Sequence, residues 1–287
     1  MTTVPAPTGA KTTWETAPTQ TINAGGVQFA YRQLGPSSGV PVVFLTHLAA
    51  VLDNWDPRVV DGIAAQHRVI TFDNRGVGAS AGSTPDTIAA MAKDAVTFIR
   101  ALGLNQVDLL GFSMGGMIAQ VITQDEPQLV RKLILAGTGP AGGEGIDNVT
   151  RISNLDTIRG LLTFTDPKQF LFFTRTPAGR QAGKQFLARL KERTHNRDKA
   201  ISLRSYAAQL KAIHRWALEQ PSDLSVIHQP VLVANGESDK MVPTKNSADL
   251  ARRLPDSQLV TYPDAGHGGI FQYHAQFVQK ALEFFDR

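Results

Sequence analysis

The chain has 287 residues, of which 42% are hydrophobic, so it is long enough to bury one large core with a smaller appendage. Lys and Arg number 29 against 25 Asp and Glu, and the resulting net charge of +4 is spread without the basic run typical of a nucleic-acid-binding protein. The chain contains no cysteine, which excludes disulfides, thiolate metal sites and a cysteine nucleophile.

The first 26 residues are rich in Thr, Pro, Ala and Gly, and they lack the apolar core of a signal peptide. We therefore expect residues 1–26 to form a flexible N-terminal arm. No window of the sequence approaches the ~18 consecutive apolar residues that a membrane span needs. These features predict a cytoplasmic protein with no membrane partner.

Short apolar runs alternate with helical patterns through the first half of the chain. Residues 27–34 are expected to form an edge strand. The later runs are short and mainly apolar, as expected of strands buried on both faces of a sheet. These predicted strands are 41–46, 67–73, 107–110 and 130–136, and the predicted helices are 55–65, 87–102 and 117–124.

The alternation stops between Gly137 and about Ser222, where helix formers dominate and no clear strand pattern is present. This stretch is long for a plain connection, so residues 138–222 are predicted to form a helical cap. Strand and helix patterns then resume, which assigns residues 27–137 and 223–287 to one α/β body with a mostly parallel sheet and helices on both faces. The predicted elements there are strands 230–235 and 258–262 and helices 245–254 and 271–285.

Ser113 stands between two glycines in GFSMG, residues 111–115, where an expected strand turns into a helix. Such a turn is crowded, and glycine neighbours remove the side chains that would clash. The hydroxyl is then held beyond the carboxyl end of the strand, where ligands bind in parallel sheets, and the helix N-terminus directs free N–H groups to the same point. The pattern predicts a nucleophile; the alternative is a serine that caps a helix in a tight turn.

A serine hydroxyl needs a base, and seven histidines are candidates. His267 lies in the glycine-rich loop DAGHGG after the last expected strand, which returns it to the edge of the sheet where the serine emerges. Asp239, in NGESD after the preceding strand, reaches the same edge and is predicted to fix the histidine tautomer. Glu237 is the alternative carboxylate, and Asp264 is expected to hydrogen-bond within its own loop.

The order serine, aspartate, histidine is that of the α/β-hydrolases, and four segments of the chain resemble that superfamily. More narrowly, they resemble its capped esterases, lactonases and perhydrolases, often labelled non-haem haloperoxidase-like. In the second segment, Asp73 and Arg75 are expected only to hold their loop in shape. The four segments are PVVFLTHLAAVLDNWD, FDNRGVGAS, GFSMGG, and NGESDKMVP with DAGHGG.

The resemblance implies an oxyanion hole formed by the backbone N–H groups of Met114 and Leu48. Family members usually carry His-Gly before the second donor, whereas this chain has Thr46-His47. The loop must therefore bend with a side chain in place of glycine. His47 is expected either to line the pocket or to hydrogen-bond within its loop.

The predicted function is hydrolysis of carboxylic esters of small, largely apolar substrates through an acyl-enzyme on Ser113, with His267 as base and acid and Asp239 stabilising its charge. No cofactor or metal is expected, because the histidines in or near the cap lack the spacing of a zinc site. Lactonases, perhydrolases and carbon–carbon bond hydrolases share the triad, and a small-ligand receptor with slow turnover is a further alternative. The expected partner is a small ester, with no nucleic acid and no membrane, and a homodimer is left open.

The predicted cap is rich in large apolar side chains, which suit an apolar acyl or alcohol group. Most of them are expected to pack the cap onto the body. They are Leu161, Leu162, Phe164, Phe170, Phe172 and Phe173.

Overall fold

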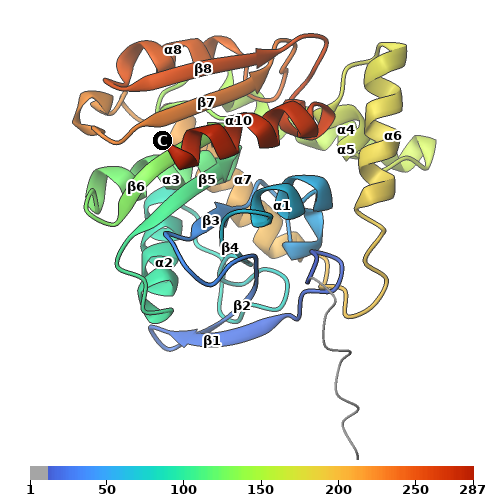
Figure 1. The fold of residues 1–287 in the computed structure, drawn as a ribbon. Helices are drawn as coiled ribbons and strands as arrows, with labels where there is room; N and C mark the ends of the chain where they lie inside the picture. Colours follow the sequence, from blue (N-terminus) through green and yellow to red (C-terminus); the bar gives the residue numbers. More distant parts are fainter. Residues whose placement is uncertain (1–11) are drawn as a thin grey trace, which may run out of the picture.

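A computed structural model describes residues 12–287, which fold around one sheet of eight strands (Figure 1). The strands are β1 (Gln20–Ala24), β2 (Val27–Leu34), β3 (Val42–Leu45), β4 (Val69–Phe72), β5 (Val107–Phe112), β6 (Val130–Ala136), β7 (Val231–Gly236) and β8 (Ser257–Tyr262). Their order across the sheet is β1-β2-β4-β3-β5-β6-β7-β8. The β1–β2 and β2–β4 pairs are antiparallel and the other pairs are parallel, so the prediction of a mostly parallel sheet is confirmed.

Helices cover both faces of the sheet, and each face has its own apolar layer. Strands β3, β4 and β5 are buried along their whole length, which explains why their sequences are mainly apolar and do not alternate between apolar and polar residues. The helices on one face are α2 (Ile88–Ala101), α3 (Met114–Asp125) and α8 (Lys245–Arg253), and those on the other are α1 (Pro57–Ala64), α9 (Gly269–Gln272) and α10 (His274–Asp286). Short 3₁₀ turns lie at Leu52–Asn54, Ile146–Asn148 and Leu224–Val226.

The structure corrects the expectation of a flexible arm for residues 12–26. Strand β1 pairs with β2 along its whole length, so β1 and not β2 is the edge strand. Trp14 is buried beside the guanidinium group of Arg32. The backbone carbonyl oxygen of Trp14 accepts a hydrogen bond from the guanidinium group of Arg193. Arg193 lies far away in the sequence, but β1 and β2 are neighbours joined by Gly25 and Gly26, both at positive φ, and this local hairpin signal was missed. Residues 1–11 lie outside the described residues.

Four helices between β6 and β7 form the helical insertion that the sequence predicts as a cap. They are α4 (Val149–Thr163), α5 (Lys168–Phe172), α6 (Pro177–Arg189) and α7 (Leu203–Leu218). In Figure 1, α4, α5 and α6 lie together at one end of the molecule, beyond the end of α10. The limits 138 and 222 stay a prediction of where the cap begins and ends.

The sequence led us to expect that most of the six large apolar residues of the cap pack it onto the body, but three of the six are exposed. Phe172 and Phe173 are buried, but Leu161, Leu162 and Phe164 are exposed. No helix within residues 12–287 has both the length and the apolar character needed to cross a membrane.

Candidate active site

Ser113 occupies the turn between β5 and α3, with backbone angles φ 57° and ψ −118°. A positive φ is rare for a residue other than glycine, and such strain is typical of a nucleophile held at a sharp strand-to-helix turn. The neighbouring glycines make this turn feasible. A Cβ atom at Gly111 would collide with the carbonyl oxygen of Gly115, and one at Gly115 with that of Leu45.

His267 and Asp239 are in direct contact. Asp239 follows β7 and His267 follows β8, and Nδ1 of His267 lies 2.8 Å from Oδ2 of Asp239. Both side chains are buried. The second carboxylate oxygen, Oδ1, accepts hydrogen bonds from the N–H groups of Met241 (2.8 Å) and Val242 (3.0 Å). This carboxylate is therefore held in one orientation, and the histidine keeps Nε2 for another partner.

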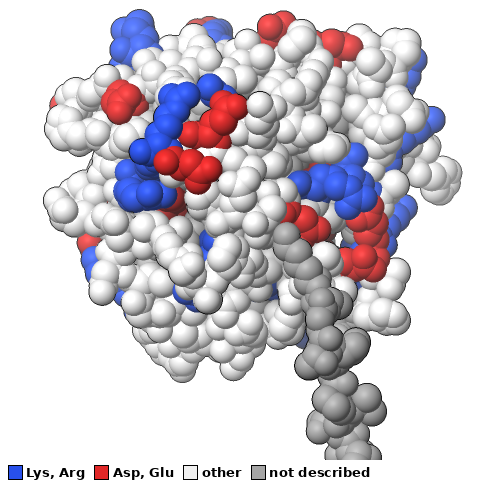
Figure 2. All heavy atoms as spheres, in the orientation of Figure 1, with Lys and Arg blue, Asp and Glu red and all other residues white. Residues whose placement is uncertain are grey.

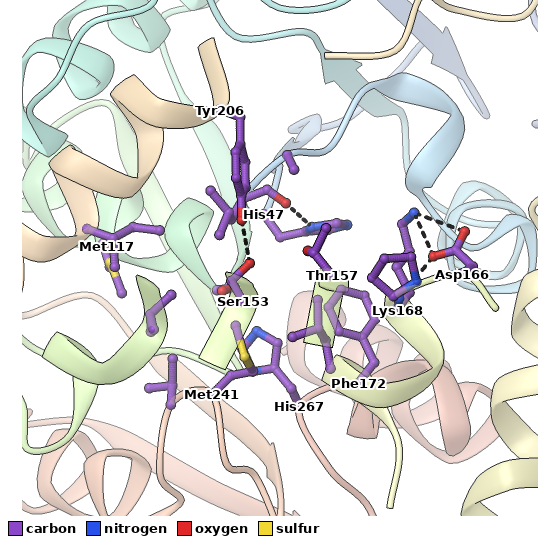
Figure 3. Close-up of a pocket in the computed structure, with 18 residues that line it drawn as sticks. His47, Met117, Ser153, Thr157, Asp166, Lys168, Phe172, Tyr206, Met241 and His267 are labelled. Atoms are coloured by element: carbon purple, nitrogen blue, oxygen red, sulfur yellow. Dashed lines mark hydrogen bonds and ion pairs between the residues drawn. The ribbon is translucent and has the colours of Figure 1, made fainter. Parts of the chain in front are cut away.

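Ser113 and His267 line the same cavity, which has a volume of about 160 Å³. Figure 3 shows His267 at one end of this cavity, beside Met241 and Phe172. Among the described residues no hydrogen bond joins the Ser113 hydroxyl to the imidazole, and catalytic hydrogen bonds are often loose before substrate binds. The structure thus brings Asp239 and His267 into contact and places Ser113 with His267 in one cavity.

The two alternative carboxylates lie elsewhere. Glu237 is exposed. Asp264 accepts hydrogen bonds from the hydroxyls of Thr174 (2.9 Å) and Thr176 (2.7 Å), which precede α6 in the cap. We had expected this side chain to hydrogen-bond within its own loop. It bonds to the cap instead. The geometry leaves Asp239 as the carboxylate that contacts His267.

The two backbone groups assigned to the oxyanion hole lie on neighbouring strands. Leu45, at the end of β3, is paired with Gly111 in β5, so the loops that carry Leu48 and Met114 leave the sheet side by side. Met114 is the first residue of α3, and its N–H has no acceptor within the helix. The N–H of Leu48 donates to no acceptor in residues 12–287. The donor role of both groups stays a prediction.

His47 has both roles that the sequence analysis considered, since it lines the cavity and hydrogen-bonds within its own loop. Its Nδ1–H donates to the carbonyl oxygen of its neighbour Leu48 at 2.8 Å, and its ring lines the cavity edge-on to Phe172 (Figure 3). Burial is the main cause that lowers the pKa of His47 from 6.5 to about 3; the hydrogen bond to Leu48 opposes this shift, and the nearby Lys168 and His267 add to it. The imidazole is therefore neutral, with Nδ1 protonated.

Because the buried imidazole of His47 is neutral, we expect the folded protein to lose stability in acid. Because the pKa of His47 is lower in the folded state than in the unfolded state, the unfolded chain binds the proton first as the pH falls below 6.5. Between about pH 8 and pH 5 the free energy of unfolding is expected to fall by about 2 kcal/mol from this group alone. The measurement is urea unfolding of the wild type and of His47→Gln across this range. Equal pH dependence in the two proteins contradicts the prediction.

The loop around Asp73 is held together as expected. The carboxylate of Asp73 accepts hydrogen bonds from the N–H groups of Leu52 (2.9 Å) and Ala79 (3.2 Å). Nη1 of Arg75 lies 3.6 Å from Oδ1 of Asp94 in α2. These contacts join the loop after β4 to its surroundings, and neither Asp73 nor Arg75 lines the cavity.

Gln209 is a residue of this site that the sequence analysis missed. It is fully buried in α7 of the cap, and its Oε1 accepts a hydrogen bond from the N–H of Ala49 at 2.8 Å. Ala49 has φ 63°, in the left-handed region, and directly follows Leu48. The cap therefore helps to hold the loop that carries the second oxyanion donor. No local pattern could reveal this, because 160 positions separate the two residues.

The charges of the cavity are few. Besides the histidines, its charged lining side chains are Lys168 and Asp166, which lie 3.4 Å apart as an ion pair. Most of the remaining lining is apolar, and the hydroxyls of Ser153 and Tyr206 hydrogen-bond to each other at 2.7 Å (Figure 3). Within the described part of the chain, no three His, Asp or Glu side chains converge in a way that could hold a metal ion.

Comparisons with known proteins agree with this fold. An α/β-hydrolase fold protein from Chitinophaga pinensis superposes with a TM-score of 0.91 at 40% identity, covering 96% of this chain and 99% of that one. A 2-hydroxy-6-oxononadienedioate/2-hydroxy-6-oxononatrienedioate hydrolase from Klebsiella pneumoniae is 31% identical over 82% of this chain and 80% of its own length. A putative non-heme chloroperoxidase from Synechocystis is 29% identical over 91% of this chain and 95% of its own length. The model of the alpha/beta hydrolase fold family matches residues 40–272, and the chain therefore belongs to that family.

Proposed function

We propose that this hydrolase cleaves carboxylic esters of small, largely apolar substrates through an acyl-enzyme intermediate on Ser113. The observation that carries the proposal is the hydrogen bond between Asp239 and His267, which lies at the cavity that the strained Ser113 also lines. A hydroxyl held at such a turn, an imidazole and an orienting carboxylate are the three groups that acyl transfer requires.

In the first step, Nε2 of His267 takes the proton from the Ser113 hydroxyl as its oxygen attacks the ester carbonyl. Asp239 accepts the Nδ1–H bond and stabilises the imidazolium ion that forms. The N–H groups of Met114 and Leu48 donate to the oxyanion of the tetrahedral intermediate. As the C–O bond to the alcohol breaks, His267 returns its proton to the leaving oxygen, and the acyl group stays on Ser113.

In the second step, a water molecule attacks the acyl-enzyme. His267 removes a proton from this water, the same two N–H groups stabilise the new oxyanion, and the bond between the acyl carbon and the Ser113 oxygen breaks. The proton on His267 then passes to the serine oxygen. The acid leaves and the enzyme returns to its starting state.

The lining of the cavity supports a neutral substrate. Lys168 and Asp166 already neutralise each other, so neither offers an unpaired charge to a substrate. The Klebsiella relative is named for dioates, which carry two carboxylates and would need cationic partners. The mainly apolar lining favours an apolar acyl or alcohol group instead.

The test is a panel of p-nitrophenyl esters from acetyl to decanoyl, together with several lactones, a β-diketone and a peracid-forming assay. We expect sustained turnover of the esters, with kcat/KM highest for acyl chains that fit a cavity of about 160 Å³. Preferred turnover of lactones or of the diketone would replace the ester proposal. A burst of one p-nitrophenol per chain without further turnover would support the receptor alternative.

A further inference from the structure

The outer face of cap helix α4 carries large apolar side chains that nothing in the described chain covers. Nine large hydrophobic residues are exposed within residues 12–287, and five of them lie between residues 155 and 164. Leu162 is 77% exposed and Phe164 is 99% exposed. We call these five residues the apolar patch: Leu155, Ile158, Leu161, Leu162 and Phe164.

The patch lies on one side of α4 because of its spacing. Leu155, Ile158 and Leu162 recur at intervals of three and four, which stacks them along one face of a helix. The opposite face is in use, since Ser153 and Thr157 line the active-site cavity. A helix that is apolar on its outer face as well as packed on its inner face normally has a partner on both.

Phe164 has the most unusual position in the patch. It ends α4 with φ 51°, in the left-handed region that favours glycine or asparagine. Its ring is almost fully exposed, so the strained backbone gains no packing within the described chain. An aromatic ring presented at the tip of a helix is suited to insertion into an apolar or interfacial environment.

A groove lined by positive side chains adjoins the patch. It has a volume of about 340 Å³, and Arg159, Arg175, Arg180 and Lys184 line it together with aromatic and apolar residues. Within residues 12–287, none of the four lies within ion-pair distance of a carboxylate. Arg159 belongs to α4 and rests over the ring of Phe170 at 4.6 Å, so it connects this groove with the patch. We call the four residues the cationic groove.

The charge of the surrounding segment favours an anionic partner. Residues 149–190 contain seven Lys or Arg and two Asp, a net charge of +5 against +4 for the whole chain. Both aspartates are already paired with lysines, Asp156 with Lys240 and Asp166 with Lys168. Figure 2 shows Lys and Arg side chains along the edge of the molecule where α6 lies in Figure 1. A symmetric contact between two copies through this face would bring like charges together.

We propose that the apolar patch and the cationic groove dock this protein reversibly on an anionic lipid surface. The five apolar side chains enter the boundary between headgroups and acyl chains, and the four cations contact lipid phosphates. The sequence led us to expect no membrane partner because it has no long apolar run. Docking on a lipid surface does not need such a run. Docking here does not depend on the proposed ester hydrolysis, although it brings the helix that lines the cavity next to a source of apolar esters.

The test is co-sedimentation of the full-length protein with sucrose-loaded vesicles of two compositions. One set contains phosphatidylcholine alone, and the other contains phosphatidylcholine with phosphatidylglycerol. We expect binding to the anionic vesicles to be at least about tenfold tighter than to the neutral ones, and to weaken as salt is added.

Two variants separate the two parts of the surface. Leu161→Ser/Leu162→Ser/Phe164→Ser removes the most exposed apolar side chains, and Arg159→Gln/Arg175→Gln/Arg180→Gln/Lys184→Gln removes the four charges. Each is expected to weaken binding to anionic vesicles by about tenfold or more. The matched control is Leu203→Ser, which alters an equally exposed leucine in α7 outside the patch and is expected to bind like the wild type. Circular dichroism melts verify that all three variants are folded.

Three results would overturn the proposal. The first is the absence of sedimentation with anionic vesicles. The second is binding that neither the patch variant nor the groove variant weakens. The third is a dimer in sedimentation velocity that the patch variant dissociates, because this would assign the patch to a second copy of the chain.

Discussion

Replacing Ser113 by alanine is expected to lower kcat for p-nitrophenyl ester hydrolysis by about 10⁴- to 10⁶-fold. The variant keeps the cavity, the Asp239–His267 pair and the oxyanion donors, but it has no oxygen to form the acyl-enzyme. Ser113 makes no side-chain cap hydrogen bond to α3, so removal of its hydroxyl leaves the helix start intact. We therefore expect little change in the thermal unfolding temperature.

A fluorophosphonate probe with intact-mass detection measures the nucleophile directly. The wild type is expected to gain one adduct, and Ser113→Ala none. The matched control is Ser153→Ala, which removes another cavity hydroxyl, one that hydrogen-bonds to Tyr206, and which should still be labelled. An adduct on the Ser113→Ala protein, or turnover within tenfold of wild type, would place the nucleophile elsewhere.

Replacing Asp239 by asparagine is expected to lower kcat by about 10⁴-fold with a much smaller change in KM. The structure gives the reason. Oδ1 of Asp239 accepts hydrogen bonds from the N–H groups of Met241 and Val242, so the amide oxygen of asparagine takes that place. The amide nitrogen then faces Nδ1 of His267 and donates to it. This forces the proton onto Nε2, and the histidine can no longer accept the serine proton.

Glu237→Gln is the control for this variant. Glu237 also follows β7, but it is exposed and makes no contact with His267 in the described structure. Its amide variant is expected to retain kcat within about twofold. A large loss in Glu237→Gln with an unaffected Asp239→Asn would reverse the assignment of the carboxylate.

The strands at the centre of the sheet could be predicted well because their information is local. The segment 130–136 is a short run that is apolar apart from Arg131 and Lys132, and its predicted limits are those of β6. Two other predictions failed. The single helix predicted at 271–285 is interrupted at Tyr273 and forms α9 and α10. The edge strand β1 was missed although its signal is local, because Gly25 and Gly26 join it to β2 in a hairpin.

The site combines local and distant information. Ser113, Asp239 and His267 could be proposed because each lies in a short loop directly after an expected strand, and parallel strands deliver such loops to one edge of the sheet. The bond from Gln209 to the loop beside Leu48 could not be proposed, since it depends on how a helix of the cap lies against the body.

By itself, then, the sequence predicted most of the strand-and-helix order and proposed Ser113, Asp239 and His267 for one edge of the sheet, because periodicity, glycine spacing and strand ends are properties of neighbouring residues. Only the tertiary structure decided that His47 is buried and neutral, that Asp264 bonds to the cap, and that α4 turns an apolar face outward. Burial and pairing of these side chains depend on groups far away along the chain, and these come close only when the cap packs on the sheet.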